Sequence, residues 1–319
     1  MRYASLPIDE VHLWCARPGE LDRDDVYDAA RRLIAPDEAQ RLERLRFARD
    51  RQTYLAARAL VRTVLSRYEP LAPAAWRFIT GRYGRPEIGP DQPALQFNLS
   101  HTGGLVVCAV ARDLDVGVDA EHIGRPAPLE VVDHCFAPTE IADLRALRDA
   151  EQPRRFFEYW TLKESYIKAR GSSLALPVDR FAFTLSADGM ASLRIDPALG
   201  EGPWRFTRYW PTPEHIVSVC VTRRHAEDAK IIPGWHSLTG SISERPSGTP
   251  GSLSEPEVPD LTGGSKTESA TPDAPEVADL IGGPSRTRTL DPLIKRVSDV
   301  GITRGRKFTR NEPNARSVA

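Results

Sequence analysis

The hydrophobic and polar positions along the first 230 residues predict helices and strands in alternation. Ala57, Leu60, Val61, Val64 and Leu65 recur at three- and four-residue intervals, which is the apolar stripe of a helix lying on a core. Short apolar or alternating runs bounded by turn residues predict strands. These runs are residues 11–16, 95–100, 105–110 and 116–121, followed by 181–185, 191–195, 204–210 and 215–221.

Two more helical regions follow from local signals. Pro36 with Asp37 and Glu38 marks a helix N-terminus, because a proline fits the first turn and acidic side chains stabilise it, and we expect that helix to run through Arg46. Another helical region spans about residues 138–170. The polar turn around Arg112 lies between the runs 105–110 and 116–121, which we interpret as a β-hairpin.

The order strand, helices, strands therefore occurs twice, with the halves meeting near Ala111. The predicted fold class is α+β, a pseudo-dimer of two similar α/β lobes with the active site between them. We place the N-terminal lobe at residues 1–111 and the C-terminal lobe at residues 112–230. The composition changes near residue 232 to Ser, Thr, Gly, Pro and acidic residues, so residues 231–319 are predicted to be a low-complexity, disordered tail.

Overall charge and composition exclude several classes of protein. Lysine and arginine number 43 against 44 acidic residues, a net charge of -1, so nothing favours general binding to nucleic acid or to a membrane surface. The four cysteines are scattered without the spacing of a zinc site, and no apolar run has the length of a signal peptide or a membrane span. We expect a cytoplasmic protein with reduced thiols.

Two carboxylates stand out in the strand VGVDAE. Strand alternation places Gly117, Asp119 and Glu121 on one face, and we expect the glycine to leave room there for a ligand. Adjacent carboxylates repel each other unless a cation lies between them, so this face is a candidate metal site. The alternative is an ordinary solvent-exposed strand end, since Asp and Glu are mostly exposed.

A second group of charged residues lies in the helical segment FFEYWTLKESYIKARGSS. Glu164 and Lys168 are four residues apart and thus share one helix face, with Lys163 beside them. Gly171 follows as a C-cap and a flexible turn. The alternative is a surface Glu–Lys pair of small energetic value.

Further residues have the chemistry to bind phosphate. In FNLSHTGG, Ser100 and His101 precede two glycines in a turn, and in GRYGRP Arg85 follows a glycine turn. Arg41 and Arg44 belong to a series of arginines in and after the first long helix. Surface arginines are ordinary, but a subset could grip a phosphate group bidentately.

Together these motifs resemble those of the Sfp-type 4′-phosphopantetheinyl transferases. That family combines a Ser-His turn, a strand carrying Gly, Asp and Glu, and a helix with Trp, Lys-Glu and Lys. They occur here in the same order as Ser100-His101, Gly117 through Glu121, and Trp160 through Lys168, within residues 1–230.

The resemblance implies an enzyme that transfers the 4′-phosphopantetheine moiety of coenzyme A to a serine of an apo acyl or peptidyl carrier protein, with release of 3′,5′-ADP. Asp119, Glu121 and Glu164 would bind Mg²⁺, which prefers oxygen ligands. Lys168 would reach the pyrophosphate of coenzyme A, and Glu164 is also a candidate for taking the serine proton. The resemblance further implies a monomer, because both lobes belong to one chain.

The coenzyme A contacts are implied in the same way. Ser100 and His101 would contact its phosphates, Arg85 its 3′-phosphate, and Arg41 and Arg44 are candidates for the remaining basic contacts. Two alternatives stay open: a Mg²⁺-dependent phosphohydrolase acting on nucleotides, since paired carboxylates with a distant Glu also serve that chemistry, and a non-enzymatic binding protein of the same fold.

Overall fold

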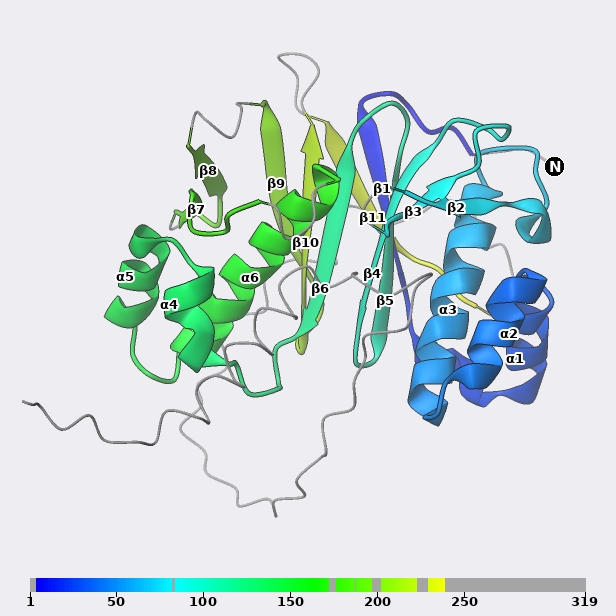
Figure 1. Ribbon diagram of the computed structural model, residues 1–319, viewed down its shortest axis with the longest axis horizontal. Helices are drawn as coiled ribbons and strands as arrows, with labels where there is room; N and C mark the ends of the chain where they lie inside the picture. Colours follow the sequence, from blue (N-terminus) through cyan, green and yellow to red (C-terminus); the bar gives the residue numbers. More distant parts are fainter. Residues whose placement is uncertain are drawn as a thin grey trace, which may run out of the picture.

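The computed structural model of the protein describes residues 4–81, 84–171, 176–186, 188–196, 202–222 and 229–238. In it, two β-sheets lie between two groups of helices (Figure 1). The helices are α1 (Asp24–Arg31), α2 (Pro36–Arg44), α3 (Ala48–Leu65), α4 (Val132–Cys135), α5 (Pro138–Ala146) and α6 (Gln152–Ala169), with 3₁₀ turns at Pro18–Asp22, Pro73–Ala75 and Leu129–Val131. The chain is thus a mixed α and β protein, as predicted.

The strands form two main sheets and two small hairpins. They are β1 (Glu10–Ala16), β2 (Phe78–Thr80), β3 (Pro86–Ile88), β4 (Gln96–Thr102), β5 (Leu105–Ala111), β6 (Val116–His122), β7 (Phe181–Leu185), β8 (Ala191–Ile195), β9 (Trp204–Thr212), β10 (His215–Thr222) and β11 (Lys230–Trp235). The first sheet has the order β11-β1-β5-β4 and the second has the order β6-β10-β9, while β2 pairs with β3 and β7 with β8.

The topology of the two halves is the same. In each half one strand is followed by helices, a long helix, a small hairpin and an antiparallel strand pair, so β1-β5-β4 corresponds to β6-β10-β9 and α3 corresponds to α6. One hydrophobic core lies between α3 and the first sheet, and another lies under α6 and the second sheet. A third core joins the sheets face to face, with side chains from β1, β5, β6 and β10.

A buried ion pair also recurs at equivalent positions. Glu38 at the start of α2 accepts a hydrogen bond from the Ala35 backbone N–H and pairs with Arg62 of α3. Glu140 at the start of α5 accepts a hydrogen bond from the Ala137 backbone N–H and pairs with Lys163 of α6. The two sequences IAPDEAQRL and FAPTEIADL share this Ala-Pro-x-Glu cap. Each carboxylate thereby fixes a short helix to the long helix of its half.

One sequence prediction about the strands is wrong. Residues 105–110 and 116–121 do not form a hairpin, because β5 pairs with β4 and β1 whereas β6 belongs to the other sheet. The hairpin is β4–β5, whose turn contains Gly104 at a φ of 81°, a conformation that glycine adopts without a steric penalty. The predicted helical region 138–170 is helical and consists of two helices, α5 and α6.

The predicted end of the folded region at residue 230 is also wrong. Residues 230–235 form β11, which runs parallel to β1 from Glu10 opposite Lys230 to Cys15 opposite Trp235. His236 then lies buried with its Nε2 3.0 Å from Thr63 Oγ1, and burial lowers the pKa of His236 to about 4. The C-terminal end of the described chain therefore completes the first sheet, so residues 231–238 of the predicted tail belong to the fold, while residues 239–319 lie outside the described residues.

We expect truncation within β11 to destabilise the protein. A chain ending at Ala229 loses the strand paired with β1 and the buried contacts of His236 and Leu238, whereas a chain ending at Leu238 keeps them. Because burying one large apolar side chain contributes about 1.5–3 kcal/mol, we expect the shorter chain to lose several kcal/mol of unfolding free energy in urea. Equal midpoints for the two truncations would contradict this role for β11.

Candidate active site at the junction of the two sheets

The predicted carboxylates lie where α6 crosses β6. A Cβ atom built on Gly117 would lie 2.0 Å from the Ser165 carbonyl oxygen and 2.4 Å from the Ala169 nitrogen, so only glycine allows α6 to pack this closely on the strand. The prediction that Gly117 leaves room for a ligand is therefore wrong, because the helix fills that space. The same strand face carries Asp119 and Glu121 towards α6.

Asp119 contacts Lys168 directly. Lys168 Nζ lies 2.7 Å from Asp119 Oδ1, and the same ammonium donates to Ser100 Oγ at 3.2 Å and to the Val118 carbonyl at 3.1 Å. Ser100 Oγ also donates to Asp119 Oδ1 at 3.0 Å. The structure thus brings together three predicted site residues from β4, β6 and α6, at a point where the two halves of the chain meet.

Glu121 pairs with an arginine that the sequence analysis did not consider. Arg125 Nη2 lies 2.9 Å from Glu121 Oε2, and its guanidinium lies 4.8 Å from the centre of the Phe157 ring on α6. The only available sequence signal was its position four residues after Glu121. Asp119, Glu121 and Glu164 are 3%, 1% and 1% exposed, so these carboxylates are not the solvent-exposed groups of the alternative interpretation.

Three buried carboxylates on packed elements have the donor chemistry that Mg²⁺ prefers. Buried negative charges need nearby positive charge, which Lys168 and Arg125 supply here for Asp119 and Glu121. Within the described residues, no group of three or more His, Cys, Asp or Glu side chains is arranged to hold a metal ion. The residue types fit the ion, and binding it would require the two basic side chains to move off these carboxylates.

Lys163 does not lie beside Glu164 and Lys168 as predicted. Its ammonium is fully buried on another side of α6, 2.8 Å from Glu140, and donates to the carbonyl oxygens of Val178 and Phe181. Burial raises the pKa of Glu140 and lowers the pKa of Lys163. Lys163 therefore anchors α6 to α5 and β7.

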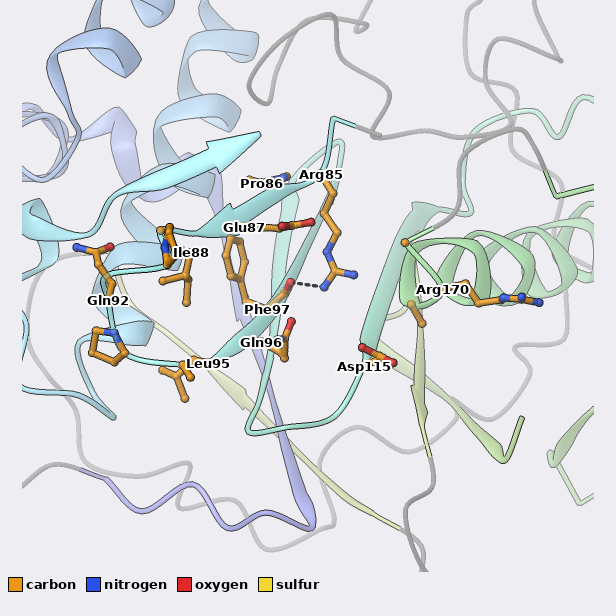
Figure 2. A pocket seen from close by; sticks show the side chains of 16 residues that line it. Arg85, Pro86, Glu87, Ile88, Gln92, Leu95, Gln96, Phe97, Asp115 and Arg170 are labelled. Atoms are coloured by element: carbon orange, nitrogen blue, oxygen red, sulfur yellow. Dashed lines mark hydrogen bonds between the residues drawn. The ribbon is translucent and has the colours of Figure 1, made fainter. Parts of the chain in front are cut away.

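The structure also places Arg85 differently from the sequence interpretation. Its guanidinium donates to the carbonyl oxygens of Phe97 at 2.7 Å, Lys168 at 3.0 Å and Val116 at 3.3 Å. Arg85, Phe97 and Asp115 line a cavity of about 500 Å³. Figure 2 shows the Arg85 side chain pointing towards Phe97. In this structure the guanidinium joins β4, β6 and the end of α6.

The remaining predicted phosphate contacts lie in the N-terminal half. His101 is buried in β4, adjacent in sequence to Ser100. Arg41 and Arg44 lie near the end of α2, which only residues 45–47 separate from α3. Arg44 is exposed and Arg41 is half-buried. Their roles in binding stay predictions.

In the described residues, no helix is long and apolar enough to cross a membrane. All four cysteines are buried and free.

Two family models match this chain. Residues 115–220 match the 4′-phosphopantetheinyl transferase superfamily, and residues 22–113 match the N-terminal region of 4′-phosphopantetheinyl transferase. The first match includes β6 and α6, the two elements that carry Asp119, Glu121, Glu164 and Lys168.

Several curated proteins are similar over most of their length. The 4′-phosphopantetheinyl transferase Sfp of Bacillus subtilis is 35% identical over 187 residues, which cover 59% of this chain and 81% of that protein. Another 4′-phosphopantetheinyl transferase of Bacillus subtilis is 32% identical, with 64% and 88% covered. The 4′-phosphopantetheinyl transferase HetI of Nostoc sp. is 32% identical, with 67% and 88% covered.

Proposed function

The chain belongs to the 4′-phosphopantetheinyl transferase superfamily, and we propose that its active site is the junction around Asp119, Glu121, Glu164 and Lys168. The enzyme transfers the 4′-phosphopantetheine moiety of coenzyme A to a serine of an apo carrier protein and releases 3′,5′-ADP. The observation that carries the assignment of the site is the contact of Lys168 with Asp119 and Ser100, which brings three motifs of the sequence together.

We propose that the chain is a pseudo-dimer of two similar lobes, because the same topology occurs in both halves. The equivalent strand orders, the equivalent long helices and the recurring Glu–Arg and Glu–Lys pairs support two similar lobes. The active residues come from β4 of the first lobe and from β6 and α6 of the second. Because one chain supplies both lobes, a monomer is sufficient to form the site.

Asp119, Glu121 and Glu164 would hold Mg²⁺. When bound, the ion supplies positive charge next to the pyrophosphate of coenzyme A. Oxygen donors and deep burial support this assignment. Movement of Lys168 off Asp119 would then free its ammonium for a phosphate oxygen of the substrate, to which a lysine donates as a compact charge.

The transfer forms one bond and breaks one. The carrier serine oxygen bonds to the β-phosphorus of coenzyme A, the bond from that phosphorus to the bridging oxygen breaks, and the electron pair stays on 3′,5′-ADP. Glu164 of α6 would take the serine proton, directly or through water. Lys168, one helical turn further along, would stabilise the negative charge on the leaving group.

We propose that coenzyme A lies along the junction. His101 and Lys168 are candidates for its phosphates, with Arg41 and Arg44 as further basic contacts. Ser100 would act through its hydrogen bonds to Asp119 and Lys168 as well as through any phosphate contact. Arg85 would reach a 3′-phosphate only by releasing its backbone carbonyls, and the cavity beside it offers space for a part of the substrate.

We expect the purified protein to add one phosphopantetheine group to an apo acyl or peptidyl carrier protein. Intact-protein mass spectrometry would measure the addition with coenzyme A and Mg²⁺, and mixtures lacking coenzyme A serve as the control. Removing divalent ions with a chelator should abolish the addition, and Mg²⁺ should restore it. No mass gain across a panel of both carrier types would overturn the transfer, whereas gain that persists after chelation would overturn only the metal assignment.

A further inference from the structure

The two halves of the chain meet along strands β4 and β6, which belong to different sheets. β4 is the last strand of the first sheet and β6 is the first strand of the second. In an ordinary sheet, two such edges would pair through backbone N–H and C=O groups. Here side chains of β4 take the place of those backbone acceptors.

Three alternating residues of β4 accept hydrogen bonds from alternating backbone N–H groups of β6. Asn98 Oδ1 accepts from Val118 at 2.8 Å, Ser100 Oγ accepts from Ala120 at 3.2 Å, and Thr102 Oγ1 accepts from His122 at 3.1 Å. The three side chains belong to residues only 5–6% exposed. Both strands repeat every two residues, so the set forms a regular ladder. We call these three contacts the β4–β6 ladder.

The ladder surrounds the two carboxylates of β6. Each of the two carboxylate residues, Asp119 and Glu121, lies between two residues whose backbone N–H donates to β4. These donors are residues 118, 120 and 122. We propose that Asn98 and Thr102 are positioning residues, which hold this segment of β6 at the distance from β4 that Asp119 and Glu121 require. The inference rests on the proposed function of the junction, and it assigns a role to residues outside the motifs that identified the family.

Other contacts between the two halves, at the ends of the β4–β6 ladder, support this role. Arg85 donates to the carbonyl oxygens of Phe97 on β4 and Val116 on β6, at one end of the ladder. At the other end, His215 Nε2 donates to the Gly103 carbonyl in the β4–β5 turn at 2.7 Å. Side chains thus join the lobes at both ends, and Ser100 in the middle links the ladder directly to Asp119 and Lys168.

A pair of substitutions at Thr102 tests the proposal. Thr102→Val keeps the shape of the side chain and removes the acceptor for the His122 N–H, whereas Thr102→Ser keeps the acceptor. We expect Val to lower kcat at least about 10-fold while KM for coenzyme A changes less than 2-fold, because the His122 N–H loses its partner and Glu121 shifts. Ser should recover most of kcat. Equal kcat values for Val and Ser would overturn the proposal.

Matched controls separate positioning from general loss of stability. Thr207→Val replaces a half-buried strand threonine on β9, at the far edge of the second sheet, and should leave kcat unchanged. Asn98→Ala should reproduce the kcat loss of Thr102→Val at the other end of the ladder. If Thr207→Val lowered kcat as much as Thr102→Val, the effect would be general and the proposal would fail.

Hydrogen exchange of the wild-type protein gives a readout that does not depend on activity. The amide protons of Val118, Ala120 and His122 should exchange at least about 100-fold more slowly than in an unfolded peptide, as expected for hydrogen-bonded amides. In Thr102→Val the protection of the His122 amide should fall at least about 10-fold. Fast exchange of these amides in the wild type would overturn the ladder even if transfer is observed, whereas absent transfer with protected amides would count against the proposed function alone.

Discussion

An Asp119→Asn variant should transfer phosphopantetheine at least about 10³-fold more slowly than the wild type while keeping its fold. Asparagine retains an oxygen that can accept hydrogen bonds from Ser100 and Lys168, but it removes the negative charge. A loss of this size corresponds to about 4 kcal/mol of transition-state stabilisation. We expect Glu164→Gln to have a similar effect, because it removes a metal-binding charge and the candidate proton acceptor together.

Single-turnover mass spectrometry would measure the rate, and thermal denaturation would test the fold. Asp133→Asn is a suitable control, because Asp133 is an exposed carboxylate of the same half that pairs with Arg145. Its replacement should change neither rate nor stability appreciably. Near-normal transfer by Asp119→Asn in a folded protein would show that Asp119 is not an active-site residue.

The second large effect concerns stability. We expect Lys163→Met to lower the unfolding free energy by about 3–5 kcal/mol, because it leaves the Glu140 carboxylate buried without its cation. Both residues are 0% exposed, and Glu140 also caps the Ala137 backbone N–H and accepts from the Phe183 N–H. Burial already raises the pKa of Glu140, so the unpaired carboxylate should take up a proton at higher pH than in the wild type.

Urea denaturation of a set of variants would measure this loss. The double variant Lys163→Met with Glu140→Gln should be more stable than the single variant, because it removes the unpaired charge while an amide oxygen can still accept a backbone N–H. Arg145→Met, which breaks an exposed ion pair, should cost less than about 1 kcal/mol. A loss below about 1 kcal/mol for Lys163→Met would show that the buried pair is not the anchor of α6.

A buried ion pair occurs at the equivalent position in the first half. Glu38 and Arg62 join α2 to α3 as Glu140 and Lys163 join α5 to α6. Arg62 also donates to the carbonyl oxygens of Pro73 and Trp76, much as Lys163 donates to carbonyls after α6. Each half thus uses a buried charge pair at the same position to fix its long helix against the elements around it.

The sequence placed the candidate site residues on the faces that the structure shows, because these signals are local. Alternation in the strand 116–121 placed Asp119 and Glu121 on one face, and the four-residue spacing of Glu164 and Lys168 placed both on one face of a helix. The structure brings Asp119 and Lys168 into contact, which neither pattern alone required. The roles of Asp119, Glu121 and Glu164 as metal ligands stay predictions.

The sequence could not distinguish between residues of the same type. Lys163 and Lys168 lie in the same helix and both were placed near Glu164, but Lys163 faces a buried carboxylate on α5. Arg85 donates to three backbone carbonyls in this structure, contacts that its sequence position did not indicate, and its role in binding phosphate stays a prediction. The residue type states what a side chain can bind, whereas the neighbouring elements decide what lies within its reach.

By itself, then, the sequence determined the alternation of helices and strands, the faces they present and the residues with the required chemistry, since these depend on neighbours a few positions away. Only the tertiary structure decided that β6 pairs with β10, that β11 returns to β1 and that α6 occupies the space above Gly117. A two-residue period shows which face of a strand is buried but not which edge it will pair with. That choice depends on packing between segments as far apart as residues 11 and 231.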